Sequence, residues 1–161
     1  MGDIQERLSN ISIFEDLAGS SERIAKIGRM LKRQTYNKGD PIITEGEEGD
    51  TLHILNRGSV RILRNTLDRE SFALVNLDAG QSVFFGEIAL IDSDRRSATV
   101  IALTDCETLT LSRQDYLSLC EEDPYIGYKI TFRIATRIAE SLRKSSSDLM
   151  TLYQALVEEI S

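Results

Sequence analysis

The chain has little of the chemistry on which most enzymes depend. Its 161 residues include one histidine, two cysteines, two prolines and no tryptophan. One histidine cannot supply the several imidazoles that a β-barrel metalloenzyme gathers around its metal. No Gly-x-Ser-x-Gly segment is present, and neither cysteine has an evident histidine partner, so nucleophilic catalysis lacks a candidate. We therefore expect neither a catalytic site nor a metal site.

Positive charge and long apolar runs are also scarce. Nineteen Lys and Arg stand against 26 Asp and Glu, a net charge of −7, which argues against a broad basic face for duplex DNA or anionic lipid. No apolar run reaches the roughly 20 residues of a membrane span, and the N-terminus is acidic where a signal peptide would be basic. We expect a cytoplasmic protein with Cys106 and Cys120 as free thiols and no membrane partner. Any anionic ligand must be met by a local positive site.

The chain is long enough for one domain with a real core, and its pattern divides into three segments. Residues 1–33 place apolar side chains at helical spacing in two short helices, with Ser20 or Ser21 capping the second. Residues 34–112 contain β-type runs at 41–44, 52–55, 60–63, 72–75, 100–103 and 108–111, separated by glycine turns. No helix of 10–15 residues separates these runs, so we expect a mainly β fold with flanking helices, an eight-stranded antiparallel jelly roll.

Helix returns in residues 113–161. Ser112 caps a hinge helix, and Pro124 fits the first turn of a longer one. From position 138 the helix carries a row of residues at alternating steps of four and three: Ile138, Leu142, Ser145, Leu149, Leu152 and Leu156. This spacing is that of a coiled-coil seam and favours a parallel homodimer, with docking on the β segment as the alternative. The serine run at 145–147, followed by Asp148, is a weak point where the helix could bend.

Residues 85–100 carry the binding chemistry. Gly86 allows the backbone to approach a ligand, and Ile88 to Leu90 can form one helical turn whose free N–H groups suit a phosphate. The guanidinium of Arg96, returning on the next strand, matches two phosphate oxygens at once. The carboxylate of Glu87 is out of place in a site that binds only an anion. It fits if the ligand also offers a hydroxyl, as a ribose does.

Phe-Gly-Glu-Ile-Ala-Leu at 85–90, followed by Arg-Ser-Ala-Thr-Val at 96–100, resembles the phosphate-binding cassette of cyclic nucleotide-binding domains. The resemblance covers roughly Leu8 to Leu142 and implies a ligand, cAMP or cGMP, but no other cofactor. It implies that Glu87 accepts a hydrogen bond from the ribose 2′-hydroxyl and that Arg96 pairs with the cyclic phosphate. The other residues that it places in the cage are Gly86, Ile88, Ala89, Ser97 and Ala98.

Base recognition and output are less closely specified. Ser97 favours cAMP over cGMP, because cGMP-selective relatives often carry threonine there. The resemblance brings Ser141 and Leu142 near the purine, although a polar helix position and a seam leucine explain them equally well. The predicted function is a sensor in which nucleotide binding moves the hinge at 111–123 and the C-terminal helix, without a DNA-binding domain in this chain. The alternative is a vestigial cassette, with Glu87 and Arg96 as a buried ion pair, in a dimerisation or docking module.

Overall fold

The structure is a computed structural model that describes residues 2–65, 71–93 and 95–160. The N-terminal segment forms the helix α1 (Gly2–Ser9), the 3-10 turn η1 (Ser12–Leu17) and the helix α2 (Ser21–Met30). Ser20 caps α2, because its hydroxyl accepts a hydrogen bond from the N–H of Arg23 at 3.4 Å. The predicted pair of short helices is thus present, with a 3-10 turn in the break between them.

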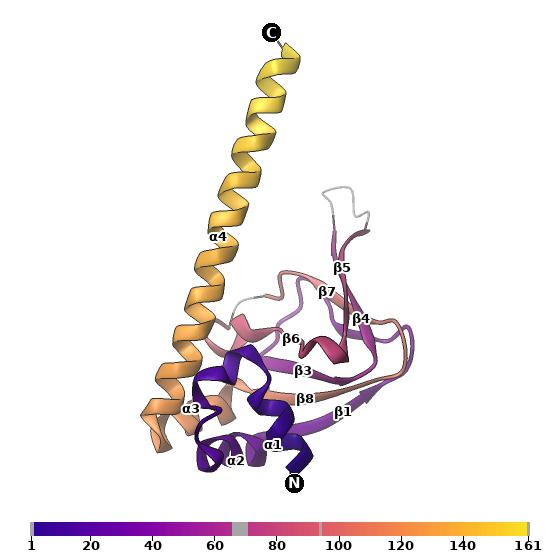
Figure 1. The fold of residues 1–161 in the computed structure, drawn as a ribbon. Helices are drawn as coiled ribbons and strands as arrows, with labels where there is room; N and C mark the ends of the chain where they lie inside the picture. The colour runs from indigo at the N-terminus through magenta and orange to yellow at the C-terminus, as the bar shows by residue number, and fades with distance from the viewer. Residues whose placement is uncertain (1, 66–70, 94, 161) are drawn as a thin grey trace.

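Two four-stranded antiparallel sheets follow, in the orders β1-β8-β3-β6 and β2-β7-β4-β5 (Figure 1). Their strands are β1 (Lys32–Tyr36), β2 (Pro41–Ile43), β3 (Thr51–Arg57), β4 (Ser59–Asn65), β5 (Ser71–Asp78), β6 (Phe84–Phe85), β7 (Thr99–Ala102) and β8 (Cys106–Ser112). This confirms the predicted eight-stranded jelly roll. Two strands, β1 and β6, were not among the predicted β-type runs, and β1 starts two residues before the expected boundary at 34.

The strand β3 joins two hydrophobic clusters, because its alternate side chains point to opposite faces of the sheet. Leu52 and Ile54 pack toward the helices, in a cluster with residues of α2 and α4 such as Ile27 and Ile130. Leu55 points into the roll, where the second cluster is completed by Val60, Phe85, Val100 and Ala102. The helices therefore cover one face of the first sheet, and the second cluster fills the space between the two sheets.

Two helices close the chain, α3 (Arg113–Glu122) and α4 (Pro124–Ile160). Ser112 caps α3 by accepting from the N–H of Asp115 at 3.1 Å, as predicted. α4 is one continuous helix of 37 residues, and the serine run at 145–147 does not interrupt it. Its buried residues end at Ile134, and the C-terminal half of the helix projects away from the roll (Figure 1). Within the described ranges, no helix is long and apolar enough to cross a membrane.

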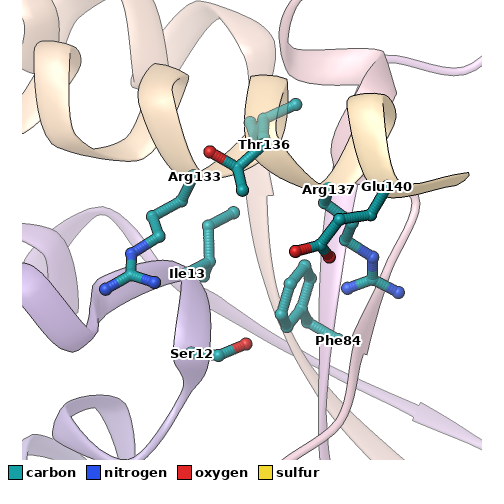
Figure 2. A pocket seen from close by; sticks show the side chains of 8 residues that line it. Ser12, Ile13, Phe84, Arg133, Thr136, Arg137 and Glu140 are labelled. Carbon is teal, nitrogen blue, oxygen red and sulfur yellow. The ribbon is translucent and has the colours of Figure 1, made fainter. Parts of the chain in front are cut away.

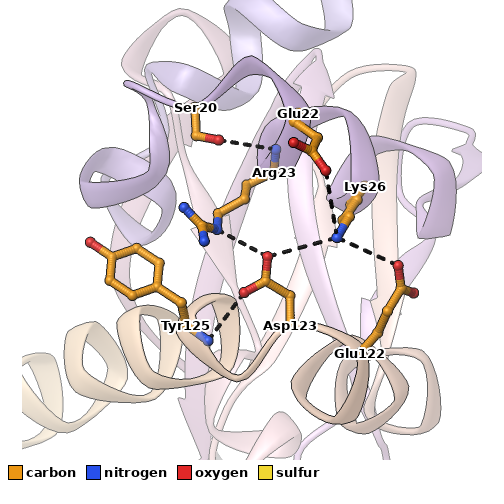
Figure 3. Close-up of polar contacts among 7 residues, drawn as sticks. All are labelled: Ser20, Glu22, Arg23, Lys26, Glu122, Asp123 and Tyr125. Carbon is orange, nitrogen blue, oxygen red and sulfur yellow. Dashed lines mark hydrogen bonds and ion pairs between the residues drawn. The ribbon is translucent and has the colours of Figure 1, made fainter.

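The junction of α3 and α4 is tied to the N-terminal helices through Asp123 (Figure 3). Its carboxylate accepts from Arg23 Nε at 3.0 Å and from the N–H of Tyr125 at 3.2 Å, and Lys26 Nζ lies 3.8 Å away. Burial alone would raise the pKa of Asp123, but the hydrogen bond and charge of Arg23 hold that pKa below its ordinary value. The start of α4 and α2 are therefore expected to move as one body.

Candidate ligand-binding site

A cavity of about 360 Å³ lies between the turn η3 (Glu87–Leu90) and β7. All the cage residues predicted from the sequence line it: Gly86, Glu87, Ile88, Ala89, Arg96, Ser97 and Ala98. Arg95 also lines the cavity and donates to the carbonyl of Gly46 at 2.7 Å. Ser141 and Leu142 lie on the exposed part of α4 and are not among the lining residues.

Gly86 sets the geometry at the start of η3. Its φ of +76° lies in the left-handed region that favours glycine. A Cβ at this position would stand 2.7 Å from Arg96 Nη1 and 3.0 Å from the carbonyl oxygen of Thr51. The sequence predicted a glycine that makes room for a ligand, and the structure shows that Gly86 also makes room for Arg96.

Arg96 is held in place by two backbone carbonyls, one at the start of β3 and one just before η3. Its Nη2 donates to the carbonyl of Thr51 at 2.8 Å, and its Nη1 donates to that of Gly86 at 3.3 Å. The backbone of Gly49 lies so close that a Cβ there would overlap the guanidinium. Burial lowers the pKa of Arg96, and the carboxylates of Asp50 and Glu87 oppose that shift. The guanidinium stays charged and has donors left for an anion.

Glu87 pairs with a residue that sequence reasoning missed. Its carboxylate, 12% exposed, lies 3.2 Å from the Nε of Arg137 on α4. The guanidinium of Arg137 also lies over the ring of Phe84, 4.4 Å from the centroid. Because Arg137 stands one helical turn before Ser141, on the same face of α4, the resemblance that brings Ser141 near the purine could have pointed to it. Glu87 therefore links the cavity to α4, and the interpretation of Glu87 and Arg96 as partners of one another is not supported.

Arg137 also forms a wall between two spaces. Besides the cavity, Arg137 lines a smaller groove of about 170 Å³ between η1 and α4. Figure 2 shows this groove, with Arg137 and Phe84 at one end and Arg133 at the other. Arg133 is held there by the carboxylate of Asp16, at 2.9 and 3.0 Å. The groove is thus bounded by side chains that tie α4 to the rest of the domain.

His53 lies within the roll, close to Arg96. It is buried on β3, and its ring is stacked on Phe85 with 5.4 Å between centroids. Burial, together with the positive charge of Arg96, lowers the pKa of His53 from 6.5 to about 4. At neutral pH the imidazole is therefore uncharged, and it serves as a packing residue behind the cavity.

Comparison with known proteins shows which family the chain is similar to. The family described as "Cyclic nucleotide-binding domain" matches residues 33–123, more than half of the chain. The cyclic AMP receptor protein of Thermus thermophilus is 34% identical over 111 residues, which cover 69% of this chain and 50% of that protein. Human cGMP-dependent protein kinase 2 is 37% identical over 111 residues, 68% of this chain and 14% of the kinase.

Structural similarity agrees with the sequence matches. The crystal structure of Thermus thermophilus catabolite activator protein matches with a TM-score of 0.76 and 31% identity, over 87% of this chain and 62% of that chain. The chain spans half or less of the length of the two curated relatives above. The matched segment 33–123 holds Glu87, Arg96 and the rest of the predicted cage. The chain therefore belongs to the cyclic nucleotide-binding domain family.

Proposed function

We propose that the chain is a non-catalytic sensor that binds cAMP in preference to cGMP and transmits binding to α4. One observation carries the proposal: the guanidinium of Arg96 and the carboxylate of Glu87 line the same cavity of about 360 Å³. A charged fork matches a cyclic phosphate, and a carboxylate beside it matches a neighbouring hydroxyl. A cyclic ribose phosphate offers both groups in one small ligand.

The roles follow from this complementarity. Arg96 pairs with the phosphate, Glu87 accepts from the ribose 2′-hydroxyl, and the backbone of the cage residues surrounds the phosphate. The choice of cAMP rests on Ser97, since cGMP-selective members of the family often carry threonine at this position. The names of the two curated relatives include one cAMP receptor and one cGMP-dependent kinase, so they favour neither base.

The ion pair between Glu87 and Arg137 supports a route to α4. A carboxylate has several lone pairs, so a ribose hydroxyl at Glu87 either shares the group with Arg137 or displaces it. Either change alters what holds α4 against the cassette. Ser141 and Leu142 are exposed, and their contact with the base requires α4 to move toward the cavity. A ligand that binds the closed arrangement better then shifts the population toward it.

We also propose that the chain pairs with a second copy through α4. We call the predicted seam the first seam: Ile138, Leu142, Ser145, Leu149, Leu152 and Leu156. Its apolar side chains are between 40% and 68% exposed. They follow the part of α4 that packs on the roll. The last buried residue of that part is Ile134. A long helix with an exposed apolar row at heptad spacing is stabilised by a parallel partner helix.

Isothermal titration calorimetry with cAMP and with cGMP tests the sensor. We expect heat from both nucleotides and tighter binding of cAMP. Absence of binding at millimolar concentrations of both would contradict the proposal and leave the vestigial alternative, a dimerisation or docking module. Equal affinities, or tighter cGMP binding, would contradict the assignment of Ser97 while leaving the sensor intact.

A further inference from the structure

The exposed apolar face of α4 is wider than one seam. A second row along the helix also alternates steps of four and three, and we call it the second seam: Tyr128, Phe132, Ala135, Ala139, Leu142, Ser146, Leu149, Tyr153, Leu156 and Ile160. It shares Leu142, Leu149 and Leu156 with the first seam. The two seams are therefore neighbouring stripes that meet at the same three leucines.

Most residues that belong only to the second seam are exposed, and Ala139 is half-buried. Tyr128, Phe132, Tyr153 and Ile160 each leave more than half of their surface in water. A two-stranded coiled coil buries a single row, so a pair formed through the first seam leaves these side chains uncovered. A helix that is apolar at a third heptad position beside a and d is typical of a bundle of more than two helices.

The chemistry of the face points to further copies of the same chain. Neither seam contains a charged residue, and Arg143, Lys144 and Asp148 all lie outside both rows. A matching surface must therefore be a long, uncharged helix face with the same four-three spacing, and this chain offers one. Both seams also carry a serine at the same level, Ser145 and Ser146, so identical faces can keep their hydroxyls together in one layer.

We propose that two α4 pairs join through the second seam, so that residues 142–160 form a four-helix core and the assembly contains four chains. This inference rests on the pairing proposed above. The segment projects beyond the roll (Figure 1), so the roll of the same chain does not cover it. Closed symmetric assemblies of this kind are the common outcome when one chain carries two self-complementary surfaces.

The mass of the 161-residue chain in solution tests the inference by sedimentation equilibrium. We expect four times the chain mass of 18.1 kDa. Tyr153→Glu, which places a charge only in the second seam, is expected to halve the mass to two chains. Leu152→Glu, which charges only the first seam, removes the pairs that the second seam joins and is expected to abolish the four-chain mass. Gln154→Glu adds the same charge outside both seams and is expected to keep four chains, and circular dichroism checks that each variant remains helical.

Each outcome separates the two proposals. A wild-type mass of two chains, lowered by Leu152→Glu and unchanged by Tyr153→Glu, overturns the four-helix core and keeps the pair. A wild-type mass of one chain overturns both. A mass of four chains that Tyr153→Glu leaves unchanged shows that the second seam is not the joining surface.

Discussion

His53 gives the most quantitative prediction, because the lowered pKa of this buried side chain makes the stability of the folded chain depend on pH. In the folded chain the pKa of His53 is about 4, against 6.5 for an unperturbed histidine. Between these values the unfolded chain binds a proton that the folded chain does not, so stability is lost as the pH falls through 6.5 and the loss is complete below about 4. The whole shift corresponds to about 3 kcal/mol, of which about 2 kcal/mol is lost between pH 7 and pH 5.

Urea unfolding at pH 7 and pH 5 measures this loss. Carboxylates also titrate in acid, so the comparison is made with His53→Gln, which keeps a polar side chain but cannot titrate. We expect the free energy of unfolding to fall by about 2 kcal/mol more in the wild type than in the variant over this interval. An equal fall in both proteins would show that His53 is not a buried neutral group, whatever the absolute stability of the variant.

Three further predictions concern single contacts. Arg137→Ala removes the link between Glu87 and α4. We expect the variant still to bind nucleotide but to lose the ligand-induced change in the distance between the roll and α4, which spin labels measure. An unchanged distance response would contradict the proposed route. Gly86→Ala forces a side chain into a left-handed φ against Arg96, and urea unfolding should show a loss of about 1–2 kcal/mol. Ser112→Ala removes the cap of α3 and should cost about 1 kcal/mol in the same assay. Wild-type stability in either of these variants would refute the geometry assigned to that residue.

The strands that the sequence did not predict are those whose strand character comes from distant pairing. β1 has the sequence Lys-Arg-Gln-Thr-Tyr and largely exposed side chains, so it lacks the alternation of a half-buried strand. It is a strand because it pairs with β8, from Lys32 opposite Thr110 to Tyr36 opposite Cys106. β6 is only two residues long and depends on β3 in the same way. Both pairings are long-range, and no local pattern records them.

In α4, by contrast, the sequence predicted a local effect that the structure does not show, a bend at the serine run. Serine costs a helix only a fraction of a kcal/mol per residue relative to the best helix formers, so three of them do not break a helix of 37 residues. Strong helix formers stand before the run (Leu142, Arg143 and Lys144) and after Asp148 (Leu149 and Met150), and propagation is cooperative. Local propensity located the residues correctly but overstated their effect.

The cavity was largely predictable because its residues are close together in sequence. The cage from Gly86 to Ala98 lies within thirteen positions, and its glycine, carboxylate and guanidinium each have a chemical reason to be there. Arg137 and Gly49 reach the site through tertiary packing, Arg137 from α4 and Gly49 from a turn that presses on Arg96. Such contacts depend on how distant elements are placed, which residue spacing alone does not specify.

The central claim, that Arg96 grips the phosphate of a cyclic nucleotide, is tested most directly by calorimetric titration of cAMP into Arg96→Ala. Losing one side of a buried charged pair costs roughly 2–5 kcal/mol, so we predict an affinity at least about 30-fold weaker than that of the wild type. The matched control is Arg61→Ala, which also removes one guanidinium charge. Arg61 donates a hydrogen bond at 2.8 Å to Oδ1 of Asn76, a residue of β5. We expect a large loss of affinity for the first variant and wild-type affinity for the second. Undiminished binding of cAMP to Arg96→Ala would contradict it.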